Sequence, residues 1–350
     1  MLLCDNQSTA VVLMPELSPA RKKLRLVKAY VSRKPIWCSW QVTYACNYRC
    51  VFCDYWKEEV NYSAEARARE ASLDEIRSAS DKLGEIGSMI VSIGGGEPLL
   101  RRDLSEIVAA IARQHFPVLT TNGSLVTEQR ARELWEAGLW GVSVSLDSSK
   151  DADHDSNRGV PGSAERARYA LQVFSATRQH SCQRVNLICV LTERNLGEME
   201  PLLRLASAHD ATLTVQPYSS LKRAAQRTTT AVPIGEDATA QLLRLKRRYS
   251  NFLSSRFFLT NLDIFHRQHG VSDCRAGQAF FNIDNFLNVQ KCVEFRAEPI
   301  GNLRELSPKD LLHRLRAERN RNACKACWYN CRGEVEALYT RGGLLERLIG

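Results

Sequence analysis

The sequence lacks any apolar run long enough to cross a membrane or to form the hydrophobic core of a signal peptide. Near the N-terminus only residues 10–14 (Ala-Val-Val-Leu-Met) are continuously apolar, and Pro15 follows them. A membrane-spanning helix needs about 20 apolar residues and a signal peptide at least about seven. We therefore predict a cytoplasmic protein without a membrane span. The sequence also has no long internal repeat and no low-complexity tract.

The composition of the 350 residues is typical of a globular protein, with 44% hydrophobic and 25% charged residues, which argues against a disordered or fibrous chain. The net charge of +9 includes basic clusters at 21–25 and 244–248. Such clusters can attract nucleic acid, anionic lipid or an acidic peptide, but solvated helix faces often look the same. Charge alone therefore selects no partner.

Twelve cysteines are present, and a reducing compartment makes metal binding or catalysis the usual reason for clustered thiols. Eight of them fall into two groups, 46–53 and 274–331. The other four, Cys4, Cys38, Cys182 and Cys189, stand apart and are interpreted as small hydrophobic residues.

The first group, Cys46, Cys50 and Cys53, has the spacing C-x3-C-x2-C. Three thiols within eight residues are one ligand short of a closed four-thiolate site. If they hold a 4Fe-4S cluster, one iron keeps an open position where a small molecule can coordinate and receive an electron. The spacing thus predicts a reactive centre and not a structural one.

Short apolar runs alternate with helical periodicity between residues 36 and 217, which predicts repeated βα units and a parallel sheet. The predicted strands are 36–43, 89–93, 118–121, 141–146, 184–191 and 212–216, and the predicted helices are 73–86, 103–113, 127–137, 163–178 and 197–209. Further helices are expected at 21–33 and 236–252, with a polar linker at 221–230. Six units allow an open doubly wound sheet or an incomplete barrel, and both place ligands at the carboxyl ends of the strands.

A glycine-rich run, residues 94–98 (Gly-Gly-Gly-Glu-Pro), directly follows the second predicted strand. Gly95 and Gly96 would let the backbone approach a ligand closely, and Glu97 adds an acceptor for a cationic group. A glycine-rich strand end on its own is more often a tight turn, but here it lies one βα unit after the three cysteines.

The cysteine spacing and the Gly95–Pro98 run together resemble the radical S-adenosylmethionine (radical SAM) superfamily. The resemblance covers roughly residues 36–217 and includes Phe52, the aromatic residue before the third cysteine. It implies that Cys46, Cys50 and Cys53 hold a 4Fe-4S cluster, that SAM chelates its open iron, and that one-electron reduction yields a 5′-deoxyadenosyl radical. The expected fold is a partial (β/α)6 barrel of parallel strands with a small Cys-rich C-terminal domain.

The resemblance also assigns expected contacts to SAM. Glu97 would accept from the methionine ammonium beside Gly95 and Gly96, and Phe52 would pack on the adenine. Polar groups at the next strand ends would surround the ribose and the carboxylate; these are Asn122, Ser145, Asp147 and Arg158. Each of these polar residues could instead cap a helix or a turn.

The second cysteine group resembles the SPASM/twitch extensions that bind auxiliary 4Fe-4S clusters. It comprises Cys274, Cys292, Cys324, Cys327 and Cys331. Because four ligands close one cluster, we expect a single auxiliary cluster, with the first four as preferred ligands and Cys331 as a possible replacement or separate thiol. A zinc knuckle has a compatible pattern.

The predicted organisation is an N-terminal extension (1–34), a radical SAM core (35–217), a helical linker (218–272) and an iron–sulfur domain (273–350). The predicted function is hydrogen abstraction from a small-molecule or peptide substrate, with a reductant such as flavodoxin or ferredoxin as partner. Only 45 residues precede Cys46, fewer than a fused leader-binding module needs. The alternatives are a zinc-stabilised nucleic-acid-binding protein, although nucleic acid is not the expected partner, and a non-catalytic electron carrier.

Overall fold

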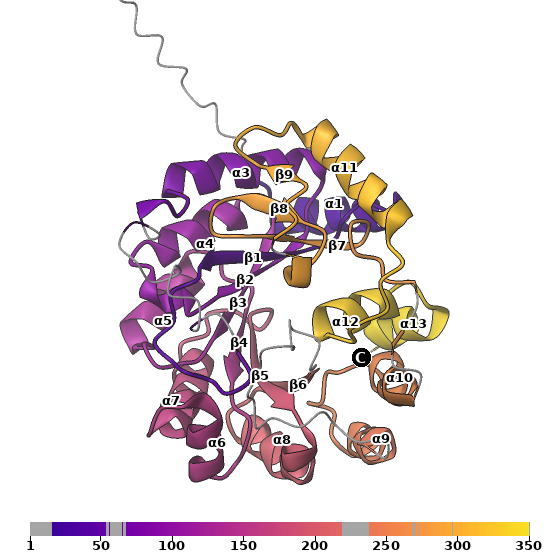
Figure 1. Cartoon of the computed structure of the whole chain (residues 1–350). Coiled ribbons are helices and arrows are strands. Elements are labelled where there is room, and N and C mark those ends of the chain that lie inside the picture. Colours follow the sequence, from indigo (N-terminus) through magenta and orange to yellow (C-terminus); the bar gives the residue numbers. More distant parts are fainter. Residues whose placement is uncertain are drawn as a thin grey trace, which may run out of the picture.

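A curved sheet of nine strands forms the centre of the protein (Figure 1). The computed structural model describes residues 16–53, 56, 65, 68–218, 238–267, 270–271, 273–295 and 297–349, so the predicted linker at 221–230 lies outside the described residues. The first six strands all pair in parallel, in the order β6-β5-β4-β3-β2-β1. Their bounds are β1 Trp37–Thr43, β2 Ile90–Gly95, β3 Phe116–Thr121, β4 Gly141–Ser145, β5 Arg184–Leu191 and β6 Thr212–Pro217. The six predicted strands and the partial barrel are therefore confirmed.

Helices follow the strands and cover the outer face of the arc (Figure 1). They are α3 Leu73–Ile86, α4 Leu104–Ala112, α5 Glu128–Glu136, α6 Asp151–Arg158, α7 Ser163–Ala176 and α8 Met199–Ala208, with short 3-10 turns at Pro98–Leu100 and Glu193–Glu198. The local sequence determines where several helices begin. Ser72 and Glu75 form a reciprocal capping box at the N-terminus of α3, and Thr127 caps the N-terminus of α5. Helix α6 has no apolar periodicity and was not predicted.

The C-terminal part continues the sheet instead of forming a detached unit. It contains α9 Ala238–Arg248, α10 Arg256–Arg267, β7 Phe280–Ile283, β8 Asn288–Gln290, a 3-10 turn Val293–Phe295, β9 Gly301–Asn302, α11 Pro308–Arg321, α12 Asn330–Ala337 and α13 Arg341–Ile349. Strand β7 pairs in parallel with β1, and β8 and β9 follow in antiparallel order. The predicted iron–sulfur domain is therefore joined to the core through β1.

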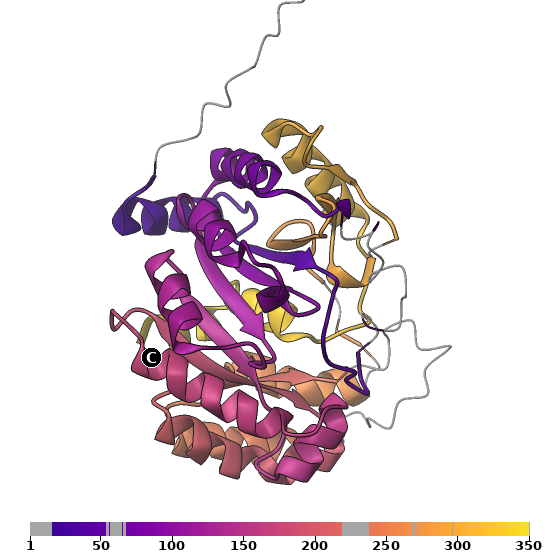
Figure 2. The same cartoon turned by 90° about the vertical axis from the view of Figure 1, so that its left-hand side faces the viewer.

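The N-terminal helix α1 (Pro19–Val31) lies against the end of the barrel, as its basic amphipathic pattern predicted. In Figure 2 this indigo helix lies on the opposite side of the strands from the gold α11, which contacts α3. Its contacts join distant segments: Lys22 Nζ donates to the Ala112 carbonyl and Tyr30 Oη to the Leu338 carbonyl.

The hydrophobic core lies between the sheet and its outer helices. Alternate strand side chains such as Val91, Ile93 and Leu187 are fully buried there, whereas their neighbours Ser92 and Asn186 face the inside of the arc. Among the described residues, no helix is long and apolar enough to cross a membrane.

Candidate active site

The three N-terminal cysteines follow β1 in a loop that is held by the end of α6. The backbone N–H of Arg49 donates to the Arg158 carbonyl at 3.2 Å, and that of Val51 donates to the Asn157 carbonyl at 3.0 Å. Gly159, in the left-handed conformation with φ 68°, lets α6 end against this loop, since a Cβ there would lie 2.6 Å from the Arg49 carbonyl oxygen. One distant segment, 157–159, thus holds the loop on both sides of Cys50.

The thiols of this loop lie close enough to influence one another. Burial raises the pKa of Cys46 to about 12 and that of Cys50 to about 11, and the neighbouring thiols add to both shifts. An iron cluster would supply the positive charge that makes thiolates favourable here, so this donor set fits a cluster. In the part of the chain that the structure describes, no three Cys, His, Asp or Glu side chains converge as around a single metal ion. A wider spacing of the thiols is compatible with a four-iron cluster, which holds its thiolates farther apart than a single metal ion does.

The glycine-rich turn packs directly against the segment that leads into the cysteine loop. Gly96 N–H donates to the Thr43 carbonyl at 2.9 Å, and Glu97 N–H donates to the Ala45 carbonyl at 2.8 Å. A Cβ on Gly96 would lie only 2.0 Å from the Ala45 carbonyl oxygen, and one on Gly95 only 2.0 Å from that of Thr43. Close backbone approach was predicted, but the side that requires glycine faces the protein's own chain. A direct contact of Gly95 and Gly96 with SAM stays a prediction.

Glu97 has a structural role that the sequence did not predict. Its side chain is fully buried and accepts three hydrogen bonds from the protein, from Leu99 N at 3.0 Å, Thr121 Oγ1 at 2.8 Å and Asn122 N at 2.7 Å. The carboxylate thus has a structural function, and its expected contact with the SAM ammonium stays a prediction. Glu97 ties the end of β2 to the end of β3.

Asn122 lies near the cysteine loop, as predicted from its place after β3. Its side-chain amide donates to Asn47 Oδ1 at 2.9 Å, and Asn47 in turn donates to Ser124 Oγ at 2.8 Å. Ser145 ends β4 at the same edge and is almost buried. Sequence reasoning did not single out Asn47, although its place between the first two cysteines was a usable signal.

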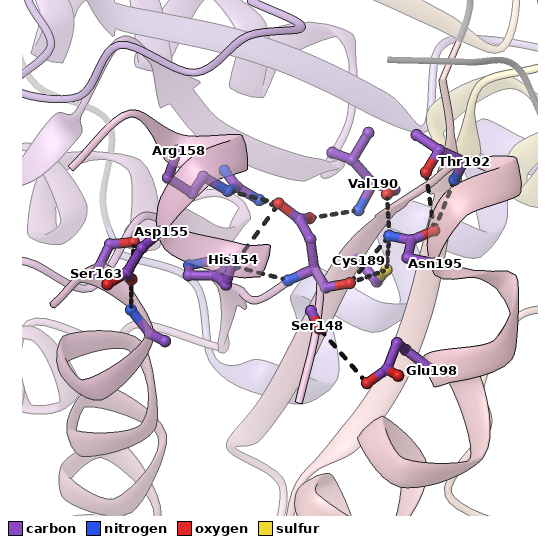
Figure 3. Close-up of polar contacts among 12 residues, drawn as sticks. Ser148, His154, Asp155, Arg158, Ser163, Cys189, Val190, Thr192, Asn195 and Glu198 are labelled. Carbon is purple, nitrogen blue, oxygen red and sulfur yellow. Dashed lines mark hydrogen bonds and ion pairs between the residues drawn. The ribbon is translucent and has the colours of Figure 1, made fainter. Parts of the chain in front are cut away.

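Asp147 and Arg158, both predicted to contact SAM, bind each other. The guanidinium donates to the carboxylate twice, at 2.7 and 2.8 Å, and both side chains are buried. Figure 3 shows the surrounding network, in which His154, Val190 and Asn195 also converge on Asp147. Arg158 is thus a carboxylate partner as predicted, but its partner is a protein side chain. The guanidinium carbon of Arg158 lies 5.1 Å from the centre of the Phe52 ring. The predicted stacking of Phe52 on adenine therefore has no direct support.

All five cysteines of the second group line one small cavity. Its walls also include Trp37 and Ser39 of β1 together with Phe281 of β7. Burial raises the pKa of four of these thiols, Cys274, Cys292, Cys327 and Cys331, and neighbouring thiols add to the shifts of the last three. Segments 50 residues apart in the sequence therefore meet in a thiol-rich site that suits an iron–sulfur cluster.

A large cavity of 1560 Å³ occupies the inner face of the arc. Hydroxyl and amide side chains from successive strands line it: Ser92, Thr120, Ser143, Asn186, Thr214 and Gln216. Aromatic side chains such as Trp140 and Phe257 complete the wall, and Cys331 and Trp37 belong to both cavities. The five-cysteine site therefore borders this large cavity.

Comparison with known proteins agrees with this geometry. The family model of the radical SAM superfamily matches residues 40–206. The mycofactocin maturase MftC of Mycolicibacterium smegmatis is 28% identical over 313 residues, which cover 85% of this chain and 77% of that protein. The Fe-coproporphyrin III synthase of Methanosarcina barkeri is 31% identical over 192 residues, covering 53% of this chain and 44% of that protein.

Two solved structures share the fold. Streptococcus suis SuiB bound to precursor peptide SuiA aligns with a TM-score of 0.64 at 16% identity, covering 93% of this chain and 77% of that chain. Native anSMEcpe with bound AdoMet and Cp18Cys peptide aligns with a TM-score of 0.59 at 17% identity, covering 79% of this chain and 80% of that chain.

A partial barrel that presents three cysteines after its first strand defines an iron–sulfur enzyme whose cluster keeps one iron open. With the family match over the same barrel, residues 40–206 form a radical SAM domain, and the C-terminal region that follows brings five cysteines together. The protein's cofactors are a 4Fe-4S cluster and SAM, which together supply a 5′-deoxyadenosyl radical that abstracts a hydrogen atom. The zinc-stabilised nucleic-acid-binding alternative is not favoured.

Proposed function

We propose that this radical SAM enzyme modifies a peptide. The chain resembles a maturase over most of its length and shares its fold with SuiB, which was solved with a precursor peptide. The observation that carries the proposal is the 1560 Å³ cavity inside the barrel, which is large enough for several residues of an extended chain. The hydroxyl and amide side chains of its walls can hydrogen-bond to peptide groups, and its aromatic side chains can hold apolar side chains.

The test uses anaerobically reconstituted, reduced enzyme and candidate peptides encoded beside its gene, each produced in deuterated medium. Deuterium in the 5′-deoxyadenosine, together with a mass change in the peptide, is the expected result. Cys50→Ser enzyme, which lacks a cluster ligand, should give neither. Deuterium transfer only from a non-peptide metabolite would refute the proposal while leaving the radical SAM assignment intact.

We also propose Cys274, Cys292, Cys327 and Cys331 as the ligands of the auxiliary cluster. These four thiols form a connected set, in which Cys274 raises the pKa of Cys327 and Cys331, and these two raise that of Cys292. Cys324 lines the same cavity but is not among the neighbours with the largest effects on the other four. The preferred set from the sequence had Cys324 in place of Cys331.

A matched pair of serine variants distinguishes the two ligand sets. Cys331→Ser should reduce the iron content from about eight towards about four per chain, because one of two four-iron clusters is lost. Cys324→Ser, at the rim of the same site, should retain both clusters. The reverse pattern would favour the set with Cys324. Equal loss in both variants would mean that the cavity collapses and would contradict the assignment of Cys324 as a bystander.

The electron donor is proposed to be a small one-electron carrier such as flavodoxin or ferredoxin, since the cluster must be reduced before SAM is cleaved. A reducing cytoplasm is the compartment that suits reduced thiols and such a donor. Replacement of dithionite by purified flavodoxin and its reductase should sustain SAM cleavage, and failure with every flavodoxin and ferredoxin of the host would contradict this donor class.

A further inference from the structure

Arg158 is a buried cation beside the first cluster site. Only 6% of the residue is exposed, and its guanidinium lies against the Cys50 thiol as well as over the Phe52 ring. A guanidinium stays protonated in proteins, and here two hydrogen bonds to the Asp147 carboxylate compensate for its burial. A full positive charge therefore sits next to a cluster ligand in a region of low dielectric, where charges act most strongly.

The carboxylate of Asp147 binds this guanidinium and partly neutralises its positive charge. This carboxylate is fully buried, accepts two bonds from Arg158, and also accepts from the Val190 N–H at 2.9 Å. Of this ion pair, the guanidinium is the member in contact with the cysteine loop, since it lies over the Phe52 ring.

His154 adds no charge to this group. Its Nδ1 accepts a hydrogen bond from the Asp147 backbone N–H at 3.0 Å, and burial lowers the pKa of its imidazole to about 4. The imidazole is therefore neutral at physiological pH. It fixes the backbone of Asp147, and through it the position of the guanidinium (Figure 3).

The loop and the cation are also connected through the backbone, since the carbonyl of Arg158 accepts from the N–H of Arg49. Any reduced iron–sulfur cluster carries one more negative charge than its oxidised form, and nearby charge and hydrogen bonds to sulfur set its potential. A cation held at Cys50 stabilises the reduced form more than the oxidised form.

We propose that Arg158 is a positioning residue that holds the Cys50 ligand and raises the reduction potential of the SAM-binding cluster, while Asp147 limits that increase. The proposal rests on the radical SAM assignment, because this cluster must accept an electron, but it does not depend on the substrate being a peptide. Arg158 acts on the ligand and not through direct contact with the substrate.

The experiment is an anaerobic redox titration of reconstituted full-length enzyme, followed by the electron paramagnetic resonance signal that changes when SAM is added. Arg158→Gln should lower the midpoint potential, Arg158→Lys should stay near wild type, and Asp147→Asn should raise it. Arg168→Gln is a matched control because Arg168 forms its ion pair with Asp151 on the outer surface; its potential should equal that of the wild type.

The opposite signs for Arg158→Gln and Asp147→Asn separate an electrostatic role from simple loss of structure, which would shift both variants in the same direction. Unchanged potentials with full iron content, or shifts of the same sign, would overturn the proposal. If Arg158→Gln cannot assemble the cluster, Asp147→Asn still decides, because only the proposed charge balance predicts a higher potential there. An enzyme that shows these shifts but modifies no peptide would refute only the proposed substrate.

Discussion

Replacing Glu97 gives the sharpest test of how the active site is held together. Glu97→Gln keeps the volume but places an amide nitrogen where a carboxylate oxygen accepts from Leu99 N or from Asn122 N. In either orientation at least one backbone N–H is left facing another donor. An unpaired buried donor costs about 1–3 kcal/mol, so Glu97→Gln should lower the free energy of unfolding by about that amount. Glu97→Ala removes all three bonds and should cost about 3 kcal/mol or more.

The assay is urea unfolding of the cluster-free protein, because the three bonds to Glu97 form without any cofactor. Binding of SAM to the reconstituted protein is measured in parallel. The structural role predicts a loss of stability in the cluster-free protein that is larger for alanine than for glutamine. Unchanged unfolding together with strongly weakened SAM binding would refute this reasoning and restore the direct ammonium contact that the sequence suggested.

Other regions give predictions of the same kind. Gly96→Ala would place a Cβ 2.0 Å from a carbonyl oxygen, so it should lower the free energy of unfolding by about 1–3 kcal/mol and reduce iron uptake. Gly94→Ala, whose Cβ would have nothing within 4 Å, should change neither. Equal effects of the two variants on the iron content would contradict this reasoning. Hydrogen bonds from Arg304 and Ser72 lower the pKa of Glu75 from 4.5 to about 2, so their stabilisation is present above pH 4.5 and lost as the pH falls towards 2. In the cluster-free protein, Arg304→Ala should therefore reduce the pH dependence of the free energy of unfolding between pH 4.5 and about 2. Arg77→Ala, which removes an exposed ion pair on the same helix, should leave this pH dependence unchanged.

The repeating part of the fold followed from the sequence, whereas the irregular parts did not. The prediction for β5 matches its bounds, and so does that for α3, because apolar periodicity and a capping box mark them locally. Helix α6 was missed since its sequence, Asp-Ala-Asp-His-Asp-Ser-Asn-Arg, has no apolar face; buried contacts of His154 and Arg158 hold it. Strand β7 is only four residues long and buried on both faces, which gives no alternation to detect.

The same limit applies to the active site. Sequence order could place polar residues at one edge of a sheet, and Glu97, Asp147 and Arg158 do lie there. It could not tell whether such groups face a ligand or each other, because that depends on which strand ends are neighbours and on how deeply each side chain is buried. Once those distances are known, Asp147 and Arg158 prove to bind each other, and Glu97 accepts its hydrogen bonds from neighbouring strand ends.

Strand β1 sets the distance between the two cysteine sites. Its beginning, at Trp37 and Ser39, forms part of the wall of the five-cysteine cavity, and its end leads within three residues to Cys46. Because a parallel strand advances roughly 3.3 Å per residue, the seven steps from Ser39 to Cys46 set a separation of up to about 23 Å. The strand is clamped on both edges, by β2 and by β7, so this spacing cannot slip without breaking two ladders. An electron that passes between the two sites would therefore cross a gap of constant length.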